Sequence, residues 1–298
     1  MKEILKYAKA ICYSGYRKGQ SPKTGICPSY EQIKEDIQIL NQEGYRYIRM
    51  YDPNQHAEYV ISAIRELKLP MTCMIGIDPK PEHNNPNSSS GAQNFSNEEL
   101  ENNKKHNENE LKKLIKLANE NEDVLQAVSI GNENTPPWGT EIVPVERLMY
   151  FAQTLKASVK QAVTYNEGYL EWKELKELGN MLDIISIHSY PLWAGKTIDE
   201  ALDFNKRHYD DIKAFFPDKQ IIFTEAGWAT GGTSSKIDSK NISVENQKRY
   251  ITELNKYLDD NKIVAFIFEA FDEYWKSDDD GVERHWGLYD EDRKRKWQ

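Results

Sequence analysis

Short apolar runs recur along this chain, and each is followed by residues with helical spacing. The first run, at residues 10–15, is apolar and ends in small and polar side chains. It is followed by Ser29-Tyr30-Glu31-Gln32, a capping box that predicts the start of a helix. Ile33, Ile37 and Leu40 then recur at the spacing of one helical face. The beginning of the chain therefore predicts a strand followed by a helix.

The same unit repeats to the end of the chain. Strands are predicted at residues 10–15, 47–52, 71–77, 128–133, 162–165, 183–190, 221–225 and 263–269. Further helices are predicted to start near Asn54, Ser96, Pro144, Thr197 and Ser243. The strand runs are apolar on both faces, which is typical of parallel strands covered by helices. This repetition predicts an α/β fold, a (β/α)8 TIM barrel that forms a single catalytic domain over residues 1–298.

The alternative fold is a doubly wound open sheet. That fold often carries a glycine-rich phosphate-binding loop after its first strand. No Gly-x-Gly-x-x-Gly or Walker-type sequence follows any of the predicted strands, which favours the barrel.

Composition and charge narrow the range of partners. The formal net charge is −9, and Lys and Glu are interspersed, so no basic stripe is available for nucleic acid. We expect a neutral or small-molecule substrate, no nucleic-acid partner, and a monomer. Cys12, Cys27 and Cys73 match no zinc or redox spacing and are expected to be reduced thiols.

No segment of the sequence predicts a membrane anchor. Nowhere do about 18 apolar residues run together, and residues 1–6 lack the apolar core of a signal peptide. We therefore expect a soluble chain with no membrane partner. Two locations stay open: the cytoplasm, and export with an earlier signal removed.

Two predicted strands end in glutamate. Residues 128–133 end in Asn132 and Glu133, and residues 221–225 end in Glu225. In a closed parallel barrel the carboxyl ends of the strands meet at one mouth, where such folds carry their chemistry. Hydrolysis of a glycoside with retention requires a pair of carboxyls, one protonated and one ionised. The alternative is that each glutamate merely leaves its strand into solvent.

Longer motifs surround these glutamates. They are Gly131-Asn132-Glu133, Thr224-Glu225-Ala226-Gly227-Trp228, Arg49-Met50-Tyr51-Asp52, Tyr190-Pro191, and a tail block at residues 268–276 and 283–288. Together they resemble glycoside hydrolase family 17, the β-1,3-glucanases and β-1,3-glucanosyltransferases of barrel clan A. The match covers nearly the whole chain.

The resemblance implies a retaining enzyme that acts on β-1,3-linked glucose, with no cofactor and no metal. It implies that Glu133 is the acid/base, that Glu225 is the nucleophile, and that Asn132 holds the sugar 2-hydroxyl. It further implies that Tyr190 is the hydrogen-bond partner of Glu225. Other substrate-binding or supporting positions are Tyr13, Arg49, Tyr51, Asp52, Trp228, Glu273, Trp275, Lys276, Glu283 and Trp286.

The charged tail positions have two interpretations. Lys276 near two carboxylates would help to hold one of them ionised, which is the asymmetry that the mechanism requires. The alternative for Glu273, Lys276 and Glu283 is an ordinary surface ion-pair cluster.

Five tryptophans follow predicted strand ends, where flat sugar faces could stack on them. For Trp228 and Trp275 we expect sugar contact rather than core packing. For Trp138, Trp193 and Trp286 the two interpretations are equally weighted.

His188 lies close to Tyr190 at the end of a predicted strand. No second histidine stands at metal-ligand spacing, so we expect a hydrogen-bonded histidine rather than a metal ligand.

Two stretches depart from the family pattern, residues 134–138 and residues 165–169. They leave endo or exo action undecided. The function predicted here is hydrolysis of β-1,3-glucosidic linkages in β-glucans or laminari-oligosaccharides by double displacement. The alternatives are a β-1,3-glucan transglycosylase and a non-catalytic carbohydrate-binding barrel.

Overall fold

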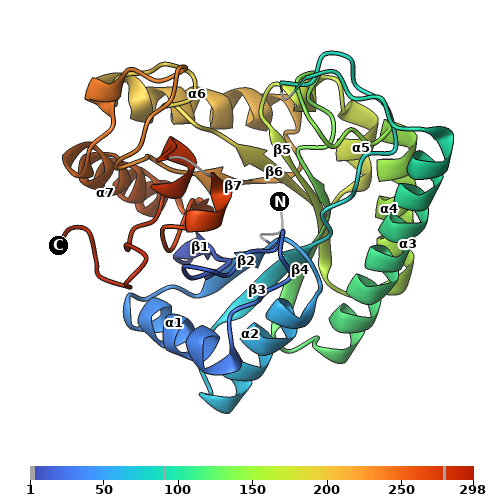
Figure 1. The fold of residues 1–298 in the computed structure, drawn as a ribbon, viewed down its shortest axis with the longest axis horizontal. Helices are drawn as coiled ribbons and strands as arrows, with labels where there is room; N and C mark the ends of the chain where they lie inside the picture. Colours follow the sequence, from blue (N-terminus) through green and yellow to red (C-terminus); the bar gives the residue numbers. More distant parts are fainter. Residues whose placement is uncertain (1–3, 90, 278–279) are drawn as a thin grey trace.

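Eight parallel strands close into a barrel at the centre of the molecule, with neighbours in chain order (Figure 1). The computed structural model describes residues 4–89, 91–277 and 280–298. The strands are β1 (Ala10–Cys12), β2 (Tyr47–Met50), β3 (Thr72–Gly76), β4 (Leu125–Asn132), β5 (Ala162–Gly168), β6 (Ile184–His188), β7 (Gln220–Ala226) and β8 (Ala265–Ile267). The predicted (β/α)8 barrel is confirmed.

Seven α-helices are found in the described residues, and they surround the barrel (Figure 1). They are α1 (Tyr30–Gln42), α2 (Gln55–Glu66), α3 (Asn97–Glu120), α4 (Val145–Ser158), α5 (Lys176–Met181), α6 (Ile198–Phe215) and α7 (Val244–Asn261). Capping boxes are present at Ser29, Ser96 and Thr197, as the sequence predicts. Each box satisfies backbone N–H groups that the first helical turn would otherwise leave unpaired.

Several element boundaries differ from the sequence prediction: β1 ends three residues earlier than predicted, at Cys12, and β4 begins three residues earlier, at Leu125. Strand β5 continues three residues beyond the predicted end, through Asn166, Glu167 and Gly168. An apolar run predicts a strand only up to Tyr165, because the residues that follow are polar. Asn166 and Glu167 are nevertheless buried at the mouth of the barrel. The short helix α5 was not predicted, because six residues are too few to establish a helical period.

Successive residues of a strand point alternately into the barrel interior and toward the surrounding helices. On β1, Ala10 and Cys12 belong to a small apolar cluster drawn from most of the strands, whereas Ile11 belongs to the large cluster that includes the helices. The pleat of a strand produces this alternation. On β2, Ile48 joins the large cluster, and Arg49, the next residue along the strand, points into the barrel mouth. The interior at the mouth is therefore polar.

The three cysteines are free, and Cys12 and Cys73 are buried, in agreement with the prediction of reduced thiols. Among the described residues, no helix combines the length and the apolar character needed to cross a membrane.

A buried ion pair fastens the segment after β8 to helix α1. Nε and Nη2 of Arg293 donate to the two carboxylate oxygens of Asp36 at 2.9 and 2.7 Å. Both side chains are almost completely buried, and Arg17 also donates to Asp36. This buried ion pair thus links the C-terminal segment to α1, although the two are far apart in sequence.

We predict that Arg293→Met lowers the free energy of unfolding by about 3 kcal/mol. This is the lower end of the roughly 3–5 kcal/mol lost when one partner of a buried pair is removed, because Arg17 remains beside Asp36. Urea denaturation measures the change. Lys294→Met is the control, since Lys294 pairs with Asp292 at an exposed site and its loss should change little. Equal effects of the two substitutions would contradict the prediction.

Candidate active site

Glu133 and Glu225 lie together at the carboxyl ends of their strands. Glu225 is the penultimate residue of β7, and Glu133 directly follows β4. One carboxylate oxygen of each residue and one ring nitrogen of His188 all lie within 4.8 Å of one another. The structure thus brings the two predicted glutamates to one site.

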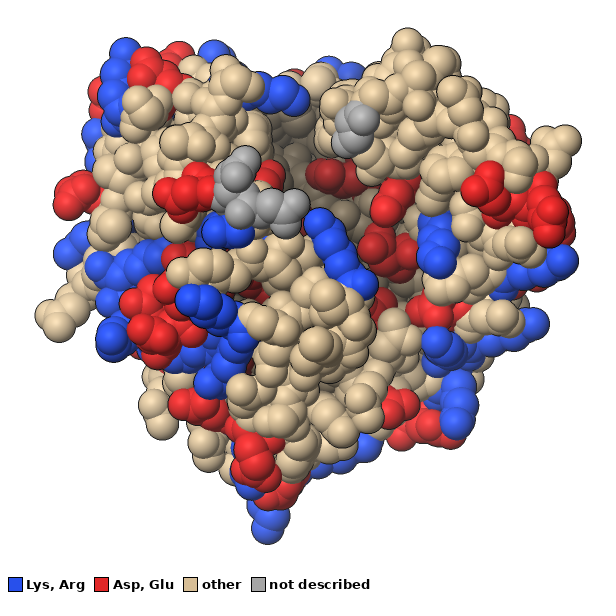
Figure 2. Space-filling model, viewed as in Figure 1, with Lys and Arg blue, Asp and Glu red and all other residues tan. Residues whose placement is uncertain are grey.

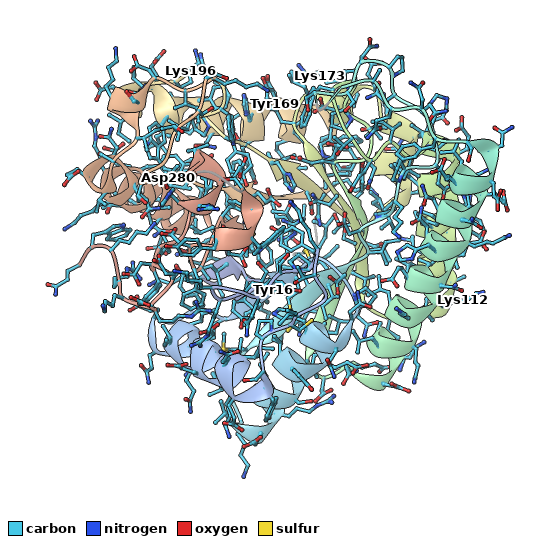
Figure 3. All side chains as sticks on the ribbon, viewed as in Figure 1. Tyr16, Lys112, Tyr169, Lys173, Lys196 and Asp280 are labelled. Carbon is cyan, nitrogen blue, oxygen red and sulfur yellow. The ribbon has the colours of Figure 1, made fainter. Side chains whose placement is uncertain are left out.

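The pair opens into a cleft of about 690 Å³. Figure 2 shows the hollow on this face with acidic side chains inside it, and Figure 3 shows Tyr16 near the middle of the same view, far from Lys112 at the outer edge. The cleft is lined by Ser14, Tyr16, Pro22, Tyr51, Asp52, Asp78, Ser89, Asn132, Glu133, Trp138, Tyr190, Trp193, Glu225, Lys236, Phe268, Trp275, Lys276 and Glu283. Most of these residues follow a strand end, as expected for a barrel site.

Glu225 is buried and surrounded by donors. Arg49 Nη1 and the Tyr51 hydroxyl donate to Oε1 at 2.5 and 3.0 Å, and the Tyr190 hydroxyl donates to Oε2 at 2.6 Å. Burial by itself would raise the pKa of Glu225, but the charges of His188 and Arg49 and the hydrogen bond from Tyr190 lower it to about 2. Glu225 is therefore held ionised. The predicted contact between Tyr190 and Glu225 is confirmed.

Arg49 also fixes Asn132. Its Nη2 donates to Asn132 Oδ1 at 2.5 Å, and its Nη1 donates to the backbone oxygen of Thr224 at 3.1 Å. Because the Asn132 oxygen is occupied, the amide NH₂ group is the part of this side chain left to meet a ligand.

Glu133 is more exposed than Glu225, with about 32% of its side chain accessible against 8%. Its backbone has a φ of +50°, in the left-handed region that few non-glycine residues adopt. Its Oε1 accepts a hydrogen bond from His188 Nδ1 at 2.7 Å. The two glutamates therefore occupy different environments, although they share one cleft.

His188 joins the two glutamates, which the sequence did not reveal. Its Nδ1 lies 3.6 Å from Glu225 Oε2 as well as 2.7 Å from Glu133 Oε1. The expected hydrogen-bonded histidine is confirmed. The three side chains could offer ligand atoms to a metal ion, but the Arg49 guanidinium already binds Glu225, and its positive charge disfavours a cation there.

Lys276 neutralises carboxylates other than the catalytic candidates. Its Nζ donates to both oxygens of Glu269 at 2.6 Å and lies 3.2 Å from Glu273. Arg49 and His188, rather than Lys276, therefore hold Glu225 ionised, which corrects that part of the sequence interpretation. Glu269 was not identified from the sequence, because its role appears only once Lys276 is placed beside it.

Glu273 and Glu283 have different positions. Glu273 is buried outside the cleft lining, and its Oε1 accepts hydrogen bonds from Ser14 Oγ and Tyr16 N at 2.6 and 3.3 Å. It supports the segment after β1, so its expected place at the substrate is corrected. Glu283 does line the cleft. Burial raises the pKa of Glu283, Lys276 opposes this shift, and the charges of Glu225 and Glu133 add to it.

Three predicted substrate contacts are wrong. Trp228 is fully buried, donates from Nε1 to the Asn241 oxygen at 2.8 Å, and packs beside Tyr250. Tyr13 is buried and donates to Asp36 at 3.1 Å. Trp286 is fully buried and outside the cleft lining. Each of these residues follows a strand end, but this position does not fix the direction of its side chain. The loops after the strands turn the three rings into the core.

Arg49 is buried and does not line the cleft, so it supports Glu225 and Asn132 from behind. The remaining predicted contacts do border the cleft. Tyr51, Asp52 and Trp275 line it, as do Trp138 and Trp193. Trp286 lies behind the cleft lining, where its ring packs edge-to-face on Tyr190 at a centroid distance of 5.2 Å. Asp78 and Ser89 were not predicted to line the cleft, since nothing in a long polar loop shows from sequence which residues turn inward.

The fold and the paired carboxyls define a barrel protein with an acidic site at the ends of β4 and β7. Residues 10–287 match the family model described as the BtgE/BtgC glycoside hydrolase domain. The chain therefore belongs to this family, and the sequence-based expectation is confirmed at the level of a glycoside hydrolase domain.

Similar proteins are known in fungi. The chain is 25% identical over 297 residues to a probable glucan endo-1,3-beta-glucosidase, btgC, of Aspergillus flavus, covering 90% of this chain and 40% of that protein. It is 28% identical over 211 residues to a glucan 1,3-beta-glucosidase of Arthroderma benhamiae, covering 62% and 64% of the two chains. The chain thus spans less than half the length of the Aspergillus relative.

Solved structures share the fold. An endo-laminarinase from Formosa Hel1_33_131 has a TM-score of 0.78 at 24% identity, over 96% of this chain and 84% of that one. A glycoside hydrolase family 17 beta-1,3-glucanosyltransferase from Rhizomucor miehei has a TM-score of 0.75 at 22% identity, over 97% and 95%. At these identities the comparison establishes the barrel architecture.

We predict unequal losses of stability for two tryptophans that sequence reasoning treated alike. Trp228→Ala should lower the free energy of unfolding by about 3–5 kcal/mol, as expected for truncating a large side chain in a core. Trp275→Ala should cost less than half as much, because this ring borders the open cleft. Urea denaturation of both variants measures the difference. Similar losses would show that Trp275 is a core residue too.

Proposed function

We propose that this chain is a retaining glycoside hydrolase of family 17 that cleaves β-1,3-glucosidic linkages in β-glucans or laminari-oligosaccharides. The observation that carries the proposal is the pairing of two carboxyls with unequal environments in one cleft. Glu225 is buried among cationic and hydroxyl donors, whereas Glu133 faces the open cleft. Oxygens less than 5 Å apart fit the roughly 5–5.5 Å carboxyl separation of retaining enzymes better than the roughly 6.5–9.5 Å of inverting ones.

In the first step, the Glu225 carboxylate attacks the anomeric carbon while Glu133 gives its proton to the leaving glycosidic oxygen. A covalent glycosyl-enzyme results. In the second step, Glu133 takes a proton from water, the water oxygen attacks the anomeric carbon, and Glu225 departs as a carboxylate. Asn132, with its oxygen held by Arg49, donates from its NH₂ group to the sugar 2-hydroxyl.

The substrate class follows from three sources of support. The curated relatives are named for activity on 1,3-β-glucan, and the structural neighbours are named for laminarin and β-1,3-glucan transfer. Aromatic rings border the cleft, where they can stack on the flat faces of neutral sugars. We propose that the active form is a monomer with a neutral oligosaccharide as its substrate.

A transglycosylase is the second candidate. Trp138 is about 52% exposed and lines the cleft together with Trp193, so rings are available for a sugar acceptor. In that reaction a sugar hydroxyl, rather than water, attacks the glycosyl-enzyme. Product analysis on a size-defined laminari-oligosaccharide distinguishes the two, because only transfer gives products longer than the substrate.

We predict that the two glutamates fail differently when removed. Glu133→Ala should slow oligosaccharide hydrolysis by roughly 10²–10⁴-fold, the usual share of acid–base catalysis. An aryl glucoside with a good leaving group should still form the glycosyl-enzyme, and azide should then release the β-azide. Glu225→Ala cannot form that intermediate, so any azide rescue should give the α-azide.

Proton NMR of the azide products reads the anomer. The reverse pattern, an α-azide from the Glu133 variant and a β-azide from the Glu225 variant, would reverse the assigned roles. If wild-type product first appears as the α-anomer, the retaining mechanism is wrong.

We predict a pH shift for Tyr190→Phe. The lowered pKa of Glu225 means that its ionised form persists above pH about 2 and is lost only as the pH falls through that value. Removing the Tyr190 hydrogen bond raises this pKa, so the acidic limb of kcat/KM should move to higher pH. Trp193→Phe is the control, because Trp193 lines the cleft but does not contact Glu225. An unchanged acidic limb in Tyr190→Phe would contradict the assignment.

A further inference from the structure

The two stretches that depart from the family pattern pack against each other beside Glu133. The Tyr165 hydroxyl accepts from Asn134 N at 2.8 Å and donates to Glu167 Oε2 at 2.6 Å. Thr135 donates to the same Glu167 oxygen from its backbone N and its Oγ1, at 3.2 and 2.8 Å. We call Asn134, Thr135, Tyr165 and Glu167 the β4–β5 clasp.

The clasp depends on a buried carboxylate. Glu167 is completely buried, and Gly168 N donates to its other oxygen at 2.7 Å. Four donors thus converge on two oxygens that face the protein interior. A carboxylate accepts at every position, whereas an amide of the same shape would turn an NH₂ group toward some of these donors. A buried carboxylate is costly unless its hydrogen bonds are made, so the four donors are a specific requirement of Glu167 at this position.

Glu133 sits between the two halves of the clasp. On its amino side, Asn132 N donates to Asn134 Oδ1 at 2.9 Å. Glu133 N itself donates to the Asn166 oxygen of β5 at 2.9 Å. A Cβ at Gly131 would lie 2.3 Å from Asn134 Oδ1, so the glycine makes room for this contact. The chain around Glu133 is therefore held from both sides.

This support matters because the Glu133 backbone is unfavourable by itself. A non-glycine residue at a φ of +50° costs on the order of 1–3 kcal/mol and persists only where its surroundings enforce it. The clasp provides that enforcement through strand β5. In this backbone conformation the Glu133 carboxyl hydrogen-bonds to His188 and lines the cleft.

We infer that Glu167 and Tyr165 are positioning residues for proton transfer by Glu133. The inference rests on the proposed function of Glu133 as the acid/base. Neither residue lines the cleft, so neither touches the substrate. Their loss should let the Glu133 backbone relax, which moves its carboxyl away from the leaving oxygen. Binding and nucleophilic attack by Glu225 should be spared.

The test compares two leaving groups, because only the poor one needs the proton of Glu133. Glu167→Gln should lower kcat/KM for a reduced laminari-oligosaccharide by about tenfold or more, up to the roughly 10²–10⁴-fold share of acid–base catalysis. For a dinitrophenyl β-glucoside, kcat/KM should change less than about twofold, because this leaving group departs without a proton. Tyr165→Phe, a milder change, should alter the same ratio in the same direction.

A buried carboxylate elsewhere serves as the matched control. Asp36→Asn disrupts the ion pairs around a fully buried carboxylate on α1 and should cost stability while leaving the ratio between the two substrates unchanged. If Glu167→Gln and Tyr165→Phe slow both substrates equally, or neither, the positioning role is wrong. Combining Glu167→Gln with Glu133→Ala should give no further loss on the oligosaccharide, and an additive loss would also overturn the inference.

A second measurement does not depend on turnover. In a crystal structure of Tyr165→Phe we expect the Glu133 carboxyl to have left its contact with His188. An unchanged Glu133 φ with an intact His188 contact would overturn the inference. Wild-type protein without activity on either substrate would refute the proposed function instead, and the crystal structure would still decide the role of the clasp.

Discussion

The buried contact between Arg49 and Glu225 is the interaction on which the rest of the site depends. Removing either charge from water costs several kcal/mol, so each charge requires partners in the interior. Arg49 finds them on two other strands: Glu225 and the Thr224 oxygen on β7, and Asn132 on β4. One guanidinium extending from β2 therefore sets the distance between the proposed nucleophile and the amide that precedes the proposed acid/base.

The unequal environments of the two glutamates follow from where their strands end. Glu225 lies within β7, where Arg49 and Tyr51 reach its carboxylate from the β2 side of the barrel and Tyr190 reaches it from the end of the neighbouring β6. Glu133 lies one residue past β4, in a turn, where His188 and the open cleft are its surroundings. A difference of two residues relative to the strand end thus gives one buried anion and one accessible carboxyl. Retention requires this asymmetry.

The sequence predicted the barrel because strands and helix caps carry local signals. The boxes at Ser29 and Ser96 need only four adjacent residues to be recognised. Directions of side chains beyond a strand end have no such signal, since the path of the loop sets them. Trp228 was therefore misplaced at the cleft. The link that His188 makes between the two glutamates and the contacts of Glu167 were missed for a related reason, because the partners come from other strands or from a loop after another strand.

The long polar loop after β3 and the loop after β4 form one wall of the cleft, which neither loop shows in its own sequence. Asn85 Nδ2 donates to the backbone oxygens of Pro137 and Gly139 at 3.0 and 2.8 Å. Arg147 on α4 pairs with buried Glu82 at 2.7 Å, which ties this wall to the helical layer. The two acceptors are backbone oxygens, which a substitution does not remove. The contact between the two loops can therefore be tested only by replacing Asn85. This wall of the cleft is thus held by a few polar side chains that do not themselves line the cleft.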